Sequence, residues 1–294
     1  MSERARVITA MGNHGLAVRD FDGASGASEP FEIRFRRSVG RPLPGDRVKL
    51  DGHGTVTAVV PRDSVFGRGV RGRFRPVAAN LDRLLVVIAP EPAPSRALLH
   101  RYVAAARIQR VAVAVVINKS DLEVPAAVPF SDLDDLGVTV YRTRATTPPS
   151  LDGLADAMRT GVHLLAGQSG VGKTSLANAL VPDRAGQTEA LSRATGKGRH
   201  TTTGARLLRI PAGGWLVDTP GVWEYELWRM PPEELARGFP EFARLDRPCR
   251  FRDCRHADEP GCAVRSAVEH GQLPESRLTA WRALLAEQRR LATD

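Results

Sequence analysis

GQSGVGKTS, from Gly167 to Ser175, is the stretch that decides the fold. It has the spacing of a phosphate-binding loop: a glycine, four residues, and then Gly-Lys-Thr. VHLLAG before it, residues 162–167, predicts a buried strand, and TSLANAL after it, residues 174–180, predicts an amphipathic helix. Because the motif needs a strand on one side and a helix on the other, we predict a nucleotide-binding α/β core.

The whole loop is expected to contact nucleotide. Its glycines let backbone N–H groups turn inward around a phosphate, and the helix N-terminus adds its positive dipole end. Lys173 is expected to reach the β- and γ-phosphates and Thr174 to ligate Mg²⁺, so both are candidate catalytic residues. The predicted nucleotide ligands of the loop are Gly167, Gln168, Ser169, Gly170, Val171, Gly172, Lys173, Thr174 and Ser175.

The composition favours an acidic partner. The 294 residues carry a net charge of +9 with a pI near 10.3, and nucleic acid is the commonest partner of such a chain. A generally arginine-rich proteome would produce the same excess. No apolar run approaches the ~20 residues of a membrane span, and the N-terminus lacks the apolar stretch of a signal peptide. We therefore expect a cytoplasmic protein without a membrane partner.

Residues 1–78 predict a small β-barrel. Five short, partly alternating segments are separated by Gly, Pro and Asp, which favours an oligonucleotide-binding (OB) barrel, with an SH3-like barrel as the alternative. The predicted strands are RVITAMG, GLAVRDF, FEIRFRR, DRVKL and GTVTAVV.

An arginine-rich segment follows the predicted barrel strands. Pro61–Arg75, expected to be a loop, holds five arginines with Phe66 and Phe74 between them. Arginines with aromatics suit phosphate contact and base stacking, so RNA contact is predicted here. The alternative is a solvated loop with two core phenylalanines.

Residues 79–229 alternate predicted strands and helices, which indicates a doubly wound α/β domain. The apolar strand VAVAVVI ends in NKSD, Asn118–Asp121. The carboxylate of Asp121 matches the two donors on the guanine edge and rejects adenine. Asn118 is expected to orient this loop and the Lys119 stem to cover the base. TRAT, Thr143–Thr146, lies where a second base-contacting loop is expected, but matches poorly.

Two further elements complete a GTPase pattern. A polar segment contains Thr201, Thr202 and Thr203, any of which can close over Mg²⁺; we take Thr202 as the candidate ligand. Asp218–Gly221 has the Asp-x-x-Gly form, in which Asp218 is expected to support Mg²⁺ from just outside its direct ligands and the Gly221 N–H to meet the γ-phosphate.

The order of the motifs along the chain, and one residue next to Asp-x-x-Gly, differ from those of ordinary small GTPases. NKSD precedes the phosphate loop, so the domain is circularly permuted, which a compact fold with neighbouring termini tolerates. Val222 follows Asp-x-x-Gly where a water-orienting glutamine is usual, and a hydrophobic side chain cannot polarise water. His200 is the nearest substitute, unless it is only a loop histidine.

Residues 230–294 predict a helical zinc-binding domain. All the cysteines of the chain gather around one histidine in CRFRDCRHADEPGC, giving Cys249, Cys254, His256 and Cys262. Three thiolates and an imidazole form a closed tetrahedral site, so one structural Zn²⁺ is predicted.

The arrangement resembles the circularly permuted, small-ribosomal-subunit-dependent GTPases of the YjeQ type. The resemblance covers nearly the whole chain and rests on PRDSVFGR, AANLD, NKSDL, GQSGVGKTSL, GRHTTT, DTPG and EPGCAV. It implies an OB barrel, a permuted GTPase core and a zinc domain, and GTP hydrolysis stimulated by the small subunit during its late assembly. It also implies that His200 is catalytic. The sequence departs at Trp223, where similar proteins often carry a basic residue.

Two other functions are kept open. Val222 favours a GTP-binding scaffold with little turnover, and the basic barrel alone would suit a DNA- or messenger-binding regulator. We expect the small subunit, its rRNA and GTP or GDP as partners of a monomeric protein.

Overall fold

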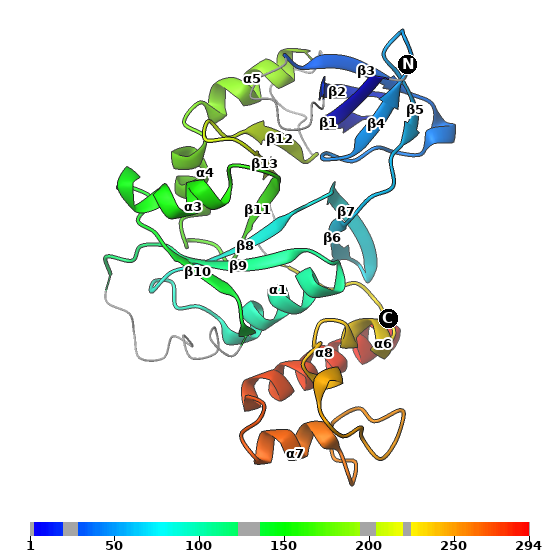
Figure 1. Ribbon diagram of the computed structural model, residues 1–294, viewed down its shortest axis with the longest axis vertical. Coiled ribbons are helices and arrows are strands. Elements are labelled where there is room, and N and C mark those ends of the chain that lie inside the picture. The colour runs from blue at the N-terminus through cyan, green and yellow to red at the C-terminus, as the bar shows by residue number, and fades with distance from the viewer. Residues whose placement is uncertain (1–2, 20–28, 123–135, 195–203, 220–224, 294) are drawn as a thin grey trace.

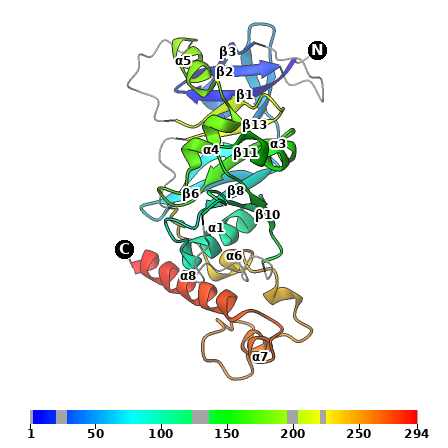
Figure 2. The same ribbon diagram turned by 90° about the vertical axis from the view of Figure 1, so that its left-hand side faces the viewer.

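The structure, a computed structural model, describes residues 3–19, 29–122, 136–194, 204–219 and 225–293. It is elongated, with a β-barrel at one end, a central sheet and a group of helices at the other end (Figures 1 and 2). Within the described residues, no helix is long and apolar enough to cross a membrane.

The N-terminal strands close into a five-stranded barrel in the order β1-β2-β3-β5-β4. The strands are β1 (Glu3–Met11), β2 (His14–Arg19), β3 (Phe31–Phe35), β4 (Arg47–Leu50) and β5 (Thr55–Val59). Alternate side chains such as Ala5, Val7, Ile33 and Val48 fill its interior and are fully buried. The predicted five-stranded barrel is therefore confirmed.

The arginine-rich segment is a β-hairpin, so the prediction of a loop was wrong. Its strands β6 (Val65–Val70) and β7 (Arg73–Ala79) form a two-stranded sheet separate from the barrel. Arg71 and Gly72 have φ values of 50° and 68°, as the two-residue turns that suit hairpins require. Phe66 is completely buried, and the ring of Phe74 packs edge-on against Trp228, with centroids 4.6 Å apart. Base stacking by Phe66 is excluded by its burial.

The central sheet has the strand order β10-β9-β8-β11-β13-β12. Only β12 runs antiparallel to its neighbour, as predicted for a largely parallel, doubly wound sheet. Its strands are β8 (Arg83–Ile88), β9 (Ala112–Ile117), β10 (Thr139–Arg142), β11 (Val162–Ala166), β12 (Arg206–Arg209) and β13 (Trp215–Asp218). β8 and β9 are almost wholly buried, which explains their continuous apolar sequences.

The helices around this sheet are α1 (Arg96–Ile108), α3 (Asp152–Ala157), α4 (Lys173–Leu180) and α5 (Arg184–Ala194). α5 was not predicted, because the polar segment after α4 lacks hydrophobic periodicity. Leu191 supplies one buried apolar contact, and the Gln187 side chain bonds both backbone groups of Arg209 on β12. Tertiary hydrogen bonds therefore stabilise α5, although its sequence lacks the amphipathic pattern of a helix.

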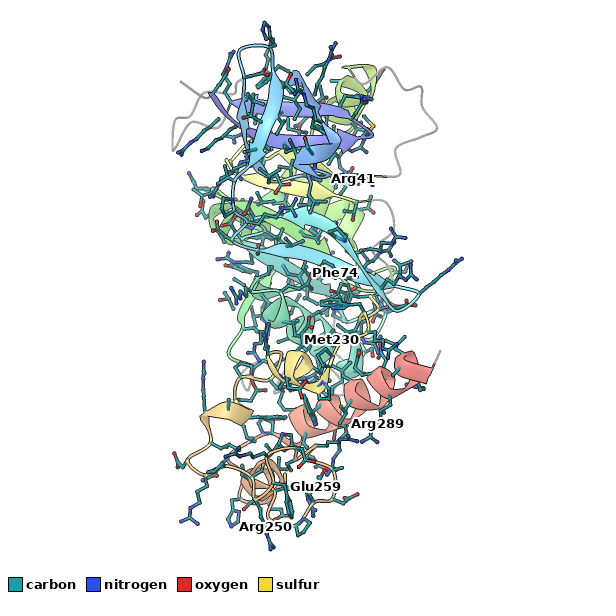
Figure 3. All side chains as sticks on the ribbon, turned by 90° about the vertical axis from the view of Figure 1, so that its right-hand side faces the viewer. Arg41, Phe74, Met230, Arg250, Glu259 and Arg289 are labelled. Atoms are coloured by element: carbon teal, nitrogen blue, oxygen red, sulfur yellow. The ribbon has the colours of Figure 1, made fainter. Side chains whose placement is uncertain are left out.

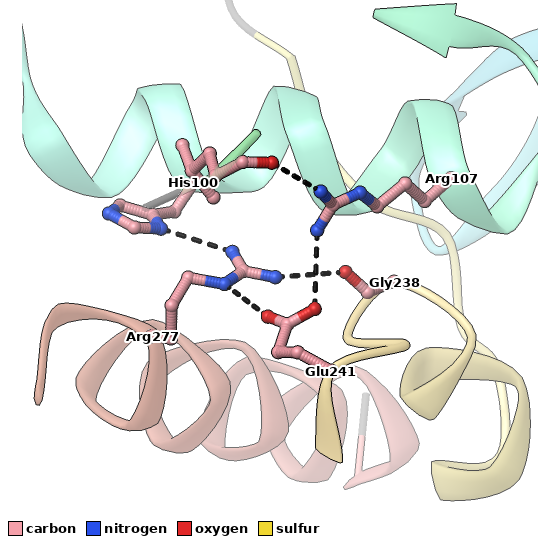
Figure 4. Close-up of polar contacts among 6 residues, drawn as sticks. His100, Arg107, Gly238, Glu241 and Arg277 are labelled. Atoms are coloured by element: carbon pink, nitrogen blue, oxygen red, sulfur yellow. Dashed lines mark hydrogen bonds and ion pairs between the residues drawn. The ribbon is translucent and has the colours of Figure 1, made fainter. Parts of the chain in front are cut away.

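The C-terminal helices are α6 (Pro232–Ala236), α7 (Ala263–Glu269) and α8 (Glu275–Thr293). They join the central domain through a buried polar network (Figure 4). Arg277 of α8, only 1% exposed, donates to Glu241 at 2.5 Å, to the Gly238 carbonyl at 3.0 Å, and lies 3.1 Å from Nδ1 of His100 on α1. Arg107 of α1 also pairs with Glu241, at 3.3 Å. These bonds hold the C-terminal helices against α1 of the central domain.

Candidate functional site

The phosphate loop lies between β11 and α4 at the carboxyl edge of the parallel strands, where α/β sheets bind ligands. Its glycines have φ values of 141° (Gly167), 82° (Gly170) and 92° (Gly172), which side chains rarely tolerate. A Cβ on Gly167 would lie 2.2 Å from the Val87 carbonyl oxygen of β8. The start of the loop therefore packs closely against the end of β8.

Lys173 lies in the fold of this loop. Its Nζ donates to the Gln168 carbonyl at 2.6 Å, and burial lowers the pKa of its ammonium to about 8. Lys173 and Thr174 line a small cavity of about 60 Å³ together with Asp218 and Thr219. The structure thus brings together the lysine, the threonine and the carboxylate that the sequence assigns to phosphate and Mg²⁺.

Asn118 joins three loops at the end of β9. Its Nδ2 donates to the Val171 carbonyl of the phosphate loop at 3.0 Å, and its Oδ1 accepts from the Thr143 hydroxyl at 3.3 Å and the Ala145 N–H at 3.2 Å. A Cβ on Gly172 would lie 2.2 Å from the same Nδ2. TRAT, despite its poor match, therefore lies beside NKSD as the prediction requires.

The other residues of NKSD face the same edge. Lys119, with a φ of 54°, extends its Nζ to the Glu91 carbonyl at 2.8 Å. Asp121 is 39% exposed and lies 3.6 Å from the Nε of Arg144. The carboxylate is open to a base, and the neighbouring Arg144 of the TRAT loop helps to orient it.

The turn between β8 and α1 also reaches the phosphate loop. The Gln168 side chain donates to the Ala93 carbonyl at 3.0 Å and accepts from the Ser95 N–H at 3.4 Å. Ser95 in turn caps α1 by accepting the Leu98 N–H. This contact was not predicted, because nothing in the APEPAPS segment resembles a nucleotide motif.

Two arginines hold Asp218, and neither was predicted. Arg206 stands opposite Asp218 in the β12–β13 pairing and donates to Oδ2 through Nε at 3.0 Å and Nη2 at 2.9 Å. Arg184 of α5 reaches Oδ1 through Nη2 at 2.7 Å. Asp218 is only 11% exposed, and a buried carboxylate needs such partners. Strand pairing and the unpredicted α5 create these contacts.

Three residues of the predicted site, His200, Thr202 and Gly221, lie outside the described residues, as do the alternative threonines Thr201 and Thr203 and the hydrophobic Val222.

Cys249, Cys254, His256 and Cys262 form the cluster that the sequence predicts. Their ligand atoms all lie within 4.8 Å of one another. Nδ1 of His256 faces inward, 3.6 Å from the Cys249 sulfur and 3.4 Å from the Cys262 sulfur. Burial, with the neighbouring thiols, raises the pKa of the Cys254 thiol to about 12. Three sulfurs and one nitrogen at this separation fit a tetrahedral metal ion, whose charge would stabilise the thiolates.

The surroundings orient the cluster. The Cys249 sulfur accepts the Ala263 N–H at 3.3 Å, and the Cys262 sulfur accepts the Arg265 N–H at 3.5 Å where it caps α7. From α8, the Trp281 indole donates to the Arg255 carbonyl at 2.7 Å and its ring packs on His256. Such outer contacts are characteristic of built metal sites.

The sheet order and the motif order together define a circularly permuted P-loop GTPase. Three parallel strands end at one edge of the sheet: β9 before NKSD, β11 before the phosphate loop, and β13 at Asp218. NKSD nevertheless comes first in the chain.

Comparisons with known proteins specify the class further. The profile of the RsgA GTPase family matches residues 59–228. The small ribosomal subunit biogenesis GTPase RsgA of Alcanivorax borkumensis is 39% identical over 94% of this chain and 82% of its own length. The protein of the same name from Chromohalobacter salexigens is 42% identical over 96% of this chain and 86% of its own.

Two solved structures share the fold. YjeQ from Thermotoga maritima superimposes with a TM-score of 0.76 at 28% identity, covering 98% of this chain and 99% of that one. YloQ, described as a circularly permuted GTPase, has a TM-score of 0.75 at 25% identity, covering 99% and 96%. The chain therefore belongs to the RsgA GTPase family and is a GTP hydrolase.

Proposed function

We propose that this protein binds the small ribosomal subunit and hydrolyses GTP during late maturation of that subunit. The observation that carries the proposal is the permuted GTPase site in a chain whose relatives, similar over more than nine-tenths of its length, are named for small-subunit biogenesis. The basic barrel and hairpin support an RNA-rich partner.

In the proposed site, Asp121 reads the guanine edge and Asn118 holds the three loops that surround the base. Lys173 pairs with the β- and γ-phosphates, and Gly221 donates its N–H to the γ-phosphate. Thr174, Thr202 and Asp218 would hold Mg²⁺, which neutralises phosphate charge when bound. Arg206 keeps the Asp218 carboxylate in place. The donor types fit the ion, because Mg²⁺ prefers hydroxyl and carboxylate oxygens.

For the chemical step, we propose that His200 orients the attacking water, since Val222 offers no polar group. A second candidate function, a GTP-binding scaffold with little turnover, is favoured by the same Val222. Loss of subunit-stimulated turnover with retained GTP binding in His200→Ala supports the enzyme; unchanged turnover excludes this role for His200.

We assign the cysteine–histidine cluster to one structural Zn²⁺ with all its ligands from Cys249, Cys254, His256 and Cys262. Four protein ligands leave no open position for chemistry. α8 contacts both the metal-ligand segment, through Trp281, and α1 of the GTPase domain, through Arg277. A bound metal would therefore help to hold α8 in the position from which Arg277 contacts α1.

An exposed basic face supports rRNA contact. Arg71, Arg73 and Arg75 project from the hairpin, Arg229 follows beside its turn, and Arg289 lies on α8. Figure 3 labels Phe74 of the hairpin, Met230 and Arg289 of α8 in succession along one side of the molecule. In the described parts of the chain, none of these five arginines pairs with a carboxylate. Their charges are available for phosphates.

Co-sedimentation with purified small subunits tests this function. We expect tighter binding with a non-hydrolysable GTP analogue than with GDP, by about 5- to 150-fold, the usual range of coupling between two sites. Replacing Arg71, Arg73 and Arg75 by alanine should weaken binding. The slope of the logarithm of the binding constant against the logarithm of salt concentration should fall by about one unit for each phosphate that the protein no longer neutralises. Arg159→Ala, at an arginine already paired with Asp156 at 2.8 Å, is the control. No co-sedimentation in any nucleotide state contradicts the proposal.

A further inference from the structure

A buried tyrosine on α1 bonds to the first residue of the phosphate loop. Tyr102 of α1 is fully buried, and its hydroxyl accepts the Gly167 N–H at 3.2 Å. Gly167 opens the loop and is pressed against the Val87 carbonyl. Burial raises the pKa of Tyr102 to about 12, so its hydroxyl stays neutral at any ordinary pH. The first turn of the loop is thus held by a side chain that no nucleotide motif predicts.

Tyr102 leads to a second buried tyrosine. The rings of Tyr102 and Tyr225 have centroids 5.1 Å apart at 45°. Tyr225, only 1% exposed, donates its hydroxyl to the Gly67 carbonyl at 2.6 Å and accepts from Nε2 of Gln109 at 2.9 Å. Gln109 follows α1, and its Oε1 accepts the Gly67 N–H at 2.5 Å. Both backbone groups of Gly67 are therefore held by side chains.

The hairpin has a structural need for these bonds. Gly67 stands opposite Pro76 at an irregularity in the β6–β7 pairing. Proline has no N–H, so it cannot donate to the Gly67 carbonyl. An unpaired buried carbonyl is costly, and the Tyr225 hydroxyl supplies the missing donor.

The same hairpin is bound to the segment that follows the Asp-x-x-Gly element. Gly69 donates its N–H to the Glu226 carbonyl at 2.7 Å, and Arg229 donates to the Gly72 carbonyl at 2.9 Å. A Cβ on Gly69 would lie 2.3 Å from the Leu227 carbonyl oxygen. The hairpin backbone therefore packs directly against this segment.

We infer that Tyr102 is a positioning residue for the phosphate loop and that Tyr225 couples it to the arginine hairpin. The path from Gly167 through Tyr102, Tyr225 and Gly67 is continuous, buried and made of bonds and ring contacts. Coupling of this kind is reciprocal: if the hairpin influences nucleotide binding, nucleotide must influence the hairpin to the same extent. This second direction is measurable in the isolated protein and does not depend on the ribosomal partner.

Amide hydrogen exchange with and without GDP tests the inference. In the wild type, GDP should slow exchange in the phosphate loop and also in residues 65–79. Tyr225→Phe keeps the ring but removes the bond to Gly67, so the hairpin response should disappear while the phosphate loop remains protected. Tyr102→Phe should also weaken GDP affinity about 2- to 10-fold, the equivalent of one net hydrogen bond.

Tyr141→Phe is the matched control, because Tyr141 is the remaining tyrosine and lies on β10, away from the hairpin pairing. It should change neither measurement. If GDP slows amide exchange in the phosphate loop of the wild type but leaves exchange in residues 65–79 unchanged, the inference is overturned, whatever the variants do. So does a hairpin response that persists in Tyr225→Phe.

Discussion

Raising the pH from 7 to 8.5 should weaken GTP binding about fourfold, because Lys173 loses its charge over this range. Burial lowers the pKa of the Lys173 ammonium to about 8 in the nucleotide-free protein. Paired phosphates favour the charged form and return the pKa toward its ordinary value. Binding therefore takes up a proton, and the affinity falls as the pH rises through about 8.

The number of protons follows from the same pKa. At pH 8.5 a lysine with a pKa of about 8 is about one-quarter protonated, so binding should take up about 0.8 proton. At pH 7 the uptake should be about 0.1 proton. Isothermal titration calorimetry in two buffers of different ionisation enthalpy measures this number directly at each pH.

Lys173→Arg is the control, because a guanidinium remains charged throughout this range. Binding in this variant, although weaker, should take up no proton. A wild-type uptake near zero at pH 8.5, with an affinity that does not change with pH, would contradict this prediction and show that Lys173 is fully charged before nucleotide binds.

Three substitutions test other parts of the protein. Asp121→Asn should weaken GTP binding and favour xanthine nucleotides, whose added carbonyl suits an amide donor; equal wild-type affinity for ATP and GTP in a competition assay would contradict this. Cys254→Ser should remove zinc and destabilise the C-terminal module, since structural zinc contributes folding free energy; metal analysis of chelator-free wild type without zinc rules the site out. Arg277→Ala should lower the free energy of unfolding by about 3–5 kcal/mol, because it leaves Glu241 partly buried without one of its two cations. The control is Arg265→Ala, because Arg265 forms an exposed ion pair with Glu269 at 3.8 Å. It should lower the free energy of unfolding, measured for both variants by urea titration, by under about 1 kcal/mol. Similar losses in the two variants would show that the burial of Arg277 is unimportant.

Much of the architecture follows from local sequence. The barrel strands, the apolar strands β8 and β9 and the phosphate loop are each specified by short-range patterns: alternation, continuous hydrophobicity, and glycines at fixed spacing. The cysteine–histidine cluster is likewise readable, since its ligands fall within one short segment.

The contacts that the sequence does not predict join residues far apart in the chain. Arg206 meets Asp218 only because β12 pairs with β13. Tyr102 and Tyr225 meet through the packing of α1 against the segment after the Asp-x-x-Gly element. The β6–β7 hairpin has a weak strand pattern because of its glycines and arginines, and side chains distant in sequence, among them Gln109 and Tyr225, bond to its backbone.

The most direct test of the proposed function is the rate of GTP hydrolysis measured with and without purified small ribosomal subunits at saturating GTP. We expect slow turnover by the isolated protein and a large increase on the subunit, as required if His200 positions the attacking water only in the subunit-bound state. A rate that the subunits leave unchanged, with the protein bound to them, would contradict it and favour the scaffold.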